Sequence, residues 1–305
     1  MDIISIAKQV LSLFIIMIIG YVMYKKRVID DEANVRYTKL VLNISLPAQI
    51  ITAFVSRQGD VSKKEVIVVF GISAVIYFIY AVIGALFLIT TKVHKRQRGT
   101  YMFMMMFGNT AFMGFPVIEA VFGQEAMVYA VIFNVVFNFL VYSIGVLMIG
   151  QDGIQGFSVK KFINMPLMSA LVSIVLFFAD IQLPEVFMTS LEFLGKVTTP
   201  VAMLILGSVL AKMKFKELVD EWRVYVFTAV NLIVIPFVVL WLMSRVFAMP
   251  RLVAGVLIVL SAMPVATNST MLAIEYDGDI PLTSKGIFFT TVLSIVTIPL
   301  IAMFC

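Results

Sequence analysis

The chain has 305 residues, of which 61% are hydrophobic and only 13% carry a charge. Soluble domains usually contain about 25% charged residues, so a water-soluble fold of this size cannot bury so much apolar surface. The composition therefore predicts an all-α membrane protein with many helices. It excludes a soluble enzyme, a nucleic-acid-binding protein and a disordered chain. The net charge of +5 fits a membrane protein, because basic loops set its orientation in the bilayer.

Ten apolar runs, separated by charged or turn-rich breaks, are candidates for membrane spans. They cover approximately residues 3–24, 37–56, 65–90, 99–122, 127–149, 162–179, 186–211, 222–247, 252–275 and 282–304. Sixteen basic residues fall in loops after odd-numbered runs or at the adjoining run ends, and five in or beside the loops after even-numbered runs. Because basic loops stay in the cytoplasm, we expect a multi-pass protein of the cytoplasmic membrane with both termini outside.

Chemistry that depends on histidine or cysteine has few residues available. His94 is the only histidine and Cys305 the only cysteine. A histidine-based metal site, a catalytic triad and a disulfide framework are therefore not expected. The glycines form no phosphate-binding motif, which excludes ATP-driven transport by this chain alone. We expect no cofactor and no enzymatic activity.

The two halves of the chain resemble each other weakly, which predicts an internal repeat. The second run places Pro47 near Asn43, and the seventh places Pro200 beside small polar residues. The fourth and ninth runs combine helix breakers with polar residues, namely Gly108, Asn109 and Thr110, and Pro264, Thr267, Asn268 and Ser269. Each half, 1–155 and 156–305, holds five runs. Because five is odd, the second half must enter the membrane inverted, as in secondary transporters.

The helix breakers in runs four and nine predict the position of a binding site. Proline removes a backbone donor, glycine tolerates unusual dihedral angles, and unwound backbone at bilayer depth must be buried or line a wet cavity. We therefore expect both helices to break near the middle of the membrane. The half-helices that begin near Thr110 and Asn268 would direct positive dipole ends to one point, which favours a carboxylate. Free carbonyls there would suit a coupling cation.

The run NTAFMGFP at residues 109–116 resembles the fourth-span motif of the auxin efflux carrier family. This family includes plant auxin exporters and bacterial permeases often labelled as malate transporters. Residues 262–276 resemble its ninth-span motif, and the resemblance covers essentially the whole chain. It implies a ten-helix, inverted five-plus-five fold similar to bile-acid symporters and sodium/proton antiporters, with Asn109 and Pro264 where broken helices four and nine cross.

The resemblance also implies a mechanism. A scaffold part at 1–58 and 159–213, usually dimeric, would hold a transport part at 64–150 and 221–305 that moves in an elevator-type alternating-access cycle. The implied function is secondary active transport, as a permease, exporter or symporter, of a small organic anion such as malate or auxin. A proton or a sodium ion is the candidate coupling ion. Two departures from the family pattern are Gly108, where plant relatives have proline, and the third run, whose only acidic residue is Glu65 at its outer edge.

Charged residues inside the expected spans leave alternatives open. Glu192 and Lys196 lie four residues apart in the seventh run. They either neutralise each other within the scaffold, or Lys196 faces the pocket and pairs with an anionic substrate. Glu119 and Glu275 occupy similar places in runs four and nine. Either both meet water at the membrane interface, or one is protonated during transport.

The full set of candidate substrate-binding residues is Gly108, Asn109, Thr110, Pro264, Thr267, Asn268, Ser269, Lys196, Asn43 and Pro47. The expected partners are the lipid bilayer, a small organic anion and a second copy of the chain, with no nucleic acid. The main alternative is a cation/proton antiporter of the same fold. Antiporters usually keep aspartates near the crossing, whereas the aspartates of this chain lie in or near loops.

Overall fold

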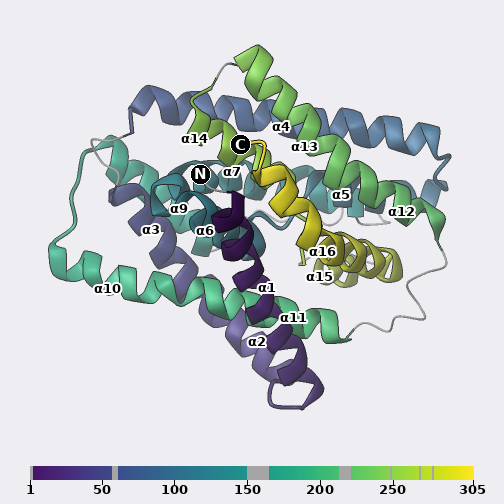
Figure 1. The fold of residues 1–305 in the computed structure, drawn as a ribbon, viewed down its shortest axis with the longest axis horizontal. Coiled ribbons are helices and arrows are strands. Elements are labelled where there is room, and N and C mark those ends of the chain that lie inside the picture. The colour runs from purple at the N-terminus through teal and green to yellow at the C-terminus, as the bar shows by residue number, and fades with distance from the viewer. Residues whose placement is uncertain are drawn as a thin grey trace. The chain divides into compact units, whose positions relative to one another are not determined.

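The computed structural model of the chain describes residues 3–56, 61–149, 165–212, 221–247, 249–267, 269–276 and 278–305. These residues form helices joined by turns (Figure 1). The single extended pairing among them is an isolated antiparallel bridge between Gly108 and Val265. The prediction of an all-α membrane protein is confirmed. Six described segments are long and apolar enough to cross a membrane: Asp31–Val55, Lys63–Thr90, Gln124–Ile149, Glu185–Lys212, Trp222–Phe247 and Ile280–Ala302.

Four shorter apolar helices fall within the remaining expected runs: Leu11–Lys25, Thr110–Phe122, Met165–Phe178 and Arg251–Ser261. Each of the ten runs therefore contains an apolar helix, while the count of ten membrane crossings stays a prediction. By their internal contacts the helices divide into two compact units. Unit 1 comprises Met1–Gly71, Ala111–Val135 and Lys160–Lys212, and unit 2 comprises Ile72–Thr110, Val136–Val159 and Met213–Cys305. The proposed division into scaffold and transport parts stays a prediction.

Unit 1 is built from helices that are distant in sequence. Its elements are α1 (Ile3–Lys25), α2 (Asp31–Leu40), η1 (Val41–Ser45), α3 (Leu46–Val55), α6 (Phe115–Phe122), η4 (Gln124–Ala126), the start of α7 (Met127–Leu140), α9 (Met165–Phe178), α10 (Glu185–Lys196) and α11 (Thr198–Lys212). Helix α1 packs along α11, and α3 packs against α9 and α10. Gly207 lies against the Met17 backbone, where a larger residue would overlap it. This close approach lets two apolar helices pack tightly.

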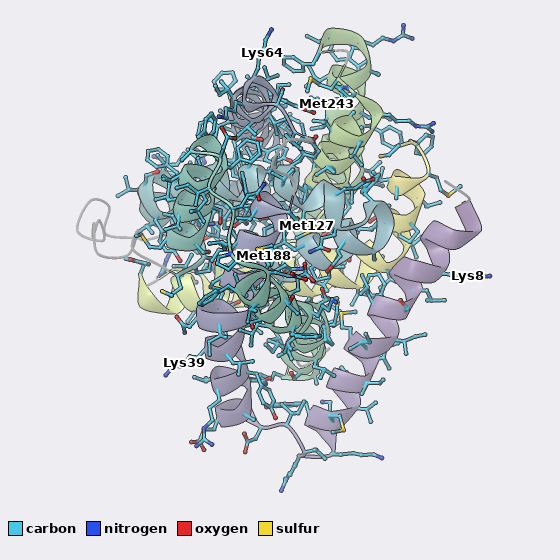
Figure 2. The ribbon with its side chains drawn as sticks, turned by 90° about the vertical axis from the view of Figure 1, so that its left-hand side faces the viewer. Lys8, Lys39, Lys64, Met127, Met188 and Met243 are labelled. Carbon is cyan, nitrogen blue, oxygen red and sulfur yellow. The ribbon has the colours of Figure 1, made fainter. Side chains whose placement is uncertain are left out.

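The labelled side chains of unit 1 differ in exposure. Lys8, Lys39 and Lys64 point outward and are exposed, whereas Met127 at the start of α7 is buried (Figure 2). Lys64 belongs to α4 (Lys63–Thr90), which begins in unit 1 and continues in unit 2. Long lysine side chains can reach water while their stems follow apolar surface.

Unit 2 holds most of α4 and the end of α7. Its other elements are η2 (Lys95–Gln97), α5 (Arg98–Met106), η5 (Val141–Gly145), α8 (Val146–Ile149), α12 (Trp222–Ala229), η9 (Val230–Val234), α13 (Ile235–Leu242), η10 (Met243–Phe247), α14 (Arg251–Ser261), α15 (Ser269–Glu275) and α16 (Ile280–Ala302). Buried aromatic rings fill its centre. The Phe107 ring centroid lies 4.8 Å from that of Phe103 and 5.6 Å from that of Phe137.

Three π-helical segments precede prolines. Segments η1, η3 (Thr110–Gly114) and η9 each end two residues before a proline, namely Pro47, Pro116 and Pro236. Proline lacks an N–H, and its ring clashes with the carbonyl four residues earlier in a regular α-helix. A wider π turn relieves that clash without ending the helix. The helix around Pro47 therefore continues through the proline.

The two prolines that suggested a repeat have unlike surroundings. Pro47 follows a π turn and is buried within an unbroken helical path. Pro200 is exposed and lies near the start of α11, just after the turn at Val197 that separates α11 from α10. Their equivalent positions in the sequence therefore do not give them equivalent local structure.

Candidate substrate site at the paired helix breaks

The helical path of the fourth run is interrupted at Phe107. Helix α5 ends at Met106, and Phe107 adopts a φ of −115° and a ψ of 88°, outside the helical region. Helical structure resumes at Thr110 in η3 and continues through α6. The break therefore consists of Phe107, Gly108 and Asn109, and it includes two of the residues that the sequence indicated.

The ninth run is interrupted over a longer stretch. Helix α14 ends at Ser261, and α15 begins only at Ser269. Pro264 lies inside this break, as expected from its missing N–H. Thr267 is half-buried at the end of the described part of the break. The expected site residue Asn268 lies outside the described residues.

The two breaks pair with each other through their backbones, within unit 2. The N–H of Asn109 donates to the carbonyl of Pro264 at 2.6 Å, and the N–H of Ala266 donates to the carbonyl of Phe107 at 3.1 Å. Between these bonds Gly108 and Val265 form the antiparallel bridge. Buried peptide groups need partners, especially inside a membrane. Each interruption therefore satisfies peptide groups that the other leaves open.

Gly108 allows the close approach of the two strands at the bridge. A Cβ atom at residue 108 would lie 3.2 Å from the carbonyl oxygen of Met263, closer than most side-chain contacts. Its backbone needs no left-handed conformation, since the described glycine with a positive φ is Gly123. The sequence pointed to Gly108 as a flexible residue, whereas the structure uses it for its small size.

Asn109 keeps an unused hydrogen-bond donor at this junction. Its side chain is 4% exposed, and its Nδ2 has no hydrogen-bond partner among the described residues. An unsatisfied buried polar group costs about 1–3 kcal/mol. Thr110 is also buried, at 2% exposure. The break therefore presents a buried donor that a ligand acceptor can satisfy.

Ser269 has a structural role in the ninth break. Its hydroxyl is buried and donates to the carbonyl of Ala266 at 2.6 Å, at the start of α15. This bond occupies its proton within the protein, so Ser269 is less suited than Asn109 to donate to a substrate. Its place as a binding residue stays a prediction.

One residue at the junction was missed by the sequence analysis. The Thr290 hydroxyl of α16 accepts a hydrogen bond from the N–H of Val265 at 3.0 Å and donates to the Gly286 carbonyl at 2.6 Å. It therefore anchors the ninth break. The available signal was a row of buried hydroxyl residues along an apolar helix, Thr283, Thr290, Thr291 and Ser294.

Three candidate site residues belong to unit 1. Asn43 is exposed, and its Nδ2 donates to the Lys39 carbonyl at 2.8 Å. Pro47 is buried in α3. Lys196 is exposed, with its Nζ 5.8 Å from the ring centroid of Phe193. Their contact with a substrate stays a prediction.

The acidic residues of runs seven and nine can be placed only in part. Among the residues that the structure describes, no ion pair joins Glu192 to Lys196. The expectation that this pair neutralises itself therefore has no contact to support it. The side chain of Glu275 lies outside the described part, so its expected protonation stays a prediction.

Interrupted apolar helices that satisfy each other's backbone at the centre of a unit are the architecture of a membrane transporter. The chain belongs to the Membrane transport protein family, whose model matches residues 5–156 and 154–302. This is the auxin efflux carrier family, so the resemblance read from the NTAFMGFP run is confirmed. The two matched segments meet at mid-chain, consistent with a repeat. A transporter family also agrees with the expected lack of enzymatic activity.

Two archaeal relatives match nearly the whole chain. An uncharacterized transporter of Methanocaldococcus jannaschii is 27% identical over 303 residues, covering 95% of this chain and 96% of the relative. An uncharacterized transporter of Methanothermobacter thermautotrophicus is 27% identical over 305 residues, covering 96% of each chain. These relatives support membrane transport and name no substrate.

Proposed function

We propose that the protein is a secondary active transporter of a small organic anion, a carboxylate of the malate or auxin type. Family membership carries the transport function. The anion specificity rests on one observation, the buried Nδ2 of Asn109 without a partner at the paired breaks.

The hydrogen-bond inventory of the junction favours an anion over a cation. The carbonyls of Phe107 and Pro264 already accept backbone hydrogen bonds. Among the described residues of the breaks, the buried side-chain atom without a partner is the Asn109 Nδ2, a donor that pairs with an acceptor such as a carboxylate oxygen. The helix that starts at Thr110 adds the positive end of its dipole, which also favours negative charge. A neutral donor holds a carboxylate without a fixed countercharge, so the substrate can leave again.

The proposal extends to the architecture and the transport cycle. Ten spans in an inverted repeat, both termini outside, a dimeric scaffold at 1–58 and 159–213 and a moving part at 64–150 and 221–305 would give elevator-type alternating access. Support comes from the apolar helix in each of the ten expected runs and from the two family matches that divide the chain at its middle.

A flux experiment on purified protein in proteoliposomes tests the substrate class. Malate, other dicarboxylates and indole-type acids are offered with and without a pH gradient. We expect saturable flux of at least one acid and at least about a tenfold loss in Asn109→Ala, the equivalent of about 1.4 kcal/mol. Thr228→Ala is the matched control, because this buried hydroxyl of unit 2 bonds only its own helix, at the Val224 carbonyl.

The outcome separates the proposal from its alternative. Flux of sodium ions or protons with no flux of any organic anion would identify a cation/proton antiporter of the same fold. Equal losses in Asn109→Ala and Thr228→Ala would show that Asn109 supports folding only.

A further inference from the structure

Glu119 of α6 lies at a second polar cluster, inside unit 1. Its Oε2 accepts a hydrogen bond from Nε2 of Gln49 at 3.1 Å and another from the Thr199 hydroxyl at 3.1 Å. Gln49 belongs to α3, and Thr199 belongs to α11. Three helices that are distant in sequence therefore converge on one carboxylate oxygen.

This carboxylate has no basic partner. Among the described residues no lysine, arginine or histidine nitrogen lies within 4.0 Å of Glu119. The charged and titratable groups on the neighbouring helical elements α1, η4, α10 and α11 are Lys8, Tyr21, Tyr24, Lys25, Glu125, Glu185, Glu192, Lys196 and Lys212. Lys212 pairs instead with Asp31, and Lys196 lies over Phe193. Elements η1 and α3 carry no charged residue. A carboxylate without a countercharge is costly in an apolar surrounding.

Unpaired buried oxygens lie on the segments that contact this carboxylate. Gln49 is 5% exposed, and its Oε1 has no partner among the described residues. The same holds for the hydroxyls of Ser45 and Thr198, each 1% exposed. Ser45 lies one helical turn before Gln49, and Thr198 adjoins Thr199. The oxygens therefore belong to the segments that contact Glu119.

The α10–α11 junction approaches Gln49 closely. A Cβ atom at Gly195 would lie 3.1 Å from the Cα of Gln49 and 3.2 Å from its backbone nitrogen. The residues that follow Gly195 lead directly to Thr198 and Thr199. Glycine at 195 therefore brings the junction against the Gln49 backbone.

The cluster has more acceptors than donors. An ionised carboxylate and an amide oxygen only accept hydrogen bonds. The Gln49 amide already directs a donor to Glu119, which leaves its buried oxygen without one. The carboxylate of Glu119 is bonded by neutral donors alone and has no positive charge beside it among the described residues. All available ligand atoms are oxygens, which suit a hard cation or a proton.

We propose that Glu119, Gln49, Thr199, Ser45 and Thr198, here termed the Glu119 cluster, bind one monovalent cation, either a proton on the carboxylate or a sodium ion among the oxygens. As the coupling cation, this ion rests on the transport function proposed above. A proton on Glu119 removes its charge and supplies a hydrogen for an unpaired acceptor. A sodium ion supplies the countercharge and takes oxygen ligands directly.

Cation binding is tested on the purified full chain without any organic anion. The melting temperature is measured in nanodiscs at increasing NaCl, with choline chloride keeping the ionic strength constant, and in parallel over a pH series without sodium. A ligand that binds only the folded state stabilises it in proportion to the logarithm of its concentration. We expect the melting temperature to rise with sodium at fixed pH, or to rise as pH falls without sodium.

Variants test whether the rise in melting temperature depends on the Glu119 cluster. Glu119→Gln should abolish this rise. Glu65→Gln should keep it, since this control removes another carboxylate of unit 1, which accepts a 2.9 Å bond from Tyr129. Thr199→Val keeps the charge and removes one donor, so its half-effective cation concentration should shift by about tenfold, as the loss of one hydrogen bond to a charged group predicts. Thr199→Val carries the test if Glu119→Gln fails to fold.

Each outcome decides something. A response to sodium identifies a sodium site, and a response to pH alone identifies a proton site. The proposal is overturned if the melting temperatures of Glu119→Gln and Thr199→Val respond to sodium or pH as the wild type does. The melting experiment contains no organic anion, so its result does not depend on the flux experiment. A cation response without organic-anion flux would contradict the proposed function and support the cation site. Flux without a cluster-dependent cation response would remove only the site.

Discussion

The paired breaks of unit 2 and the Glu119 cluster of unit 1 use similar neutral side chains and reach opposite polarity. At the breaks Asn109 keeps a free amide nitrogen, while the nearby carbonyls of Phe107 and Pro264 are already bonded. In the cluster Gln49 gives its amide nitrogen to Glu119 and keeps a free oxygen. Asparagine and glutamine carry the same functional group. In the two proposals, the anion preference at the breaks rests on the buried amide nitrogen of Asn109, and the cation preference of the cluster rests on the carboxylate that the Gln49 amide nitrogen contacts.

The sharpest way to break this comparison is to reverse the charge preference at the breaks. In Asn109→Asp a carboxylate replaces the free donor and opposes a carboxylate substrate. Like charges in contact cost several kcal/mol, so we expect organic-anion flux in proteoliposomes to fall by about a hundredfold or more. Gln182→Glu, which adds a carboxylate at an exposed position outside the candidate set, should keep most of the flux. If the substrate is a cation instead, its own flux should rise in Asn109→Asp, because the new carboxylate attracts positive charge.

The second prediction concerns the anchor of the ninth break. Thr290→Val removes the acceptor for the Val265 N–H and leaves a buried backbone donor unsatisfied, at a cost of about 1–3 kcal/mol. We expect a lower melting temperature together with weaker anion flux. Thr228→Val is the control, because its hydroxyl returns only to its own helix. Equal effects of the two substitutions would show that Thr290 does not hold the break.

A third prediction perturbs the Glu119 cluster without touching its polar atoms. In Gly195→Ala the new methyl group would press on the Gln49 backbone. We expect a destabilisation of about 1–3 kcal/mol, as for other overpacked contacts, and a weaker cation response. Gly71→Ala is the control, since a Cβ there meets nothing within 4 Å. A cation response unchanged in Gly195→Ala would separate Gln49 from the site.

The smallest effect is expected at Lys196. Its exposed ammonium lies over Phe193, a contact worth about 0.5–1 kcal/mol at exposed sites. Lys196→Met should therefore leave organic-anion flux within about twofold of the wild type at equal protein levels. A tenfold loss would restore the interpretation in which Lys196 binds the substrate.

Local chemistry made the breaks predictable from the sequence. Pro264 cannot donate in a helix, and Gly108 and Asn109 stand beside polar residues in an otherwise apolar run, so the interruption follows from the residues themselves. The backbone pairing across the breaks was harder to foresee. It joins Asn109 to Pro264, and their approach depends on how α5 and α14 each pack against α16.

Packing also explains why the Glu119 cluster could not be recognised in advance. Glu119 lies 70 residues from Gln49 and 80 from Thr199 in sequence. Which face of each helix turns toward the others is decided by tertiary contacts, and three polar residues in three apolar helices give no periodic signal. The sequence singled out Glu119 for its charge alone. Gln49 and Thr199 are ordinary polar residues until the helices are assembled.

The two hydrogen bonds that join Phe107 and Asn109 to Ala266 and Pro264 are made by main-chain atoms. These backbone hydrogen bonds do not depend on the chemical identity of most of the surrounding side chains. If the breaks bind the solute as proposed, solute preference would be changed by replacing those side chains, while the backbone that presents them stays intact. For protein engineering, substitutions in the residues that flank the paired backbone, rather than in the paired segments, are the ones to test for transport of new solutes.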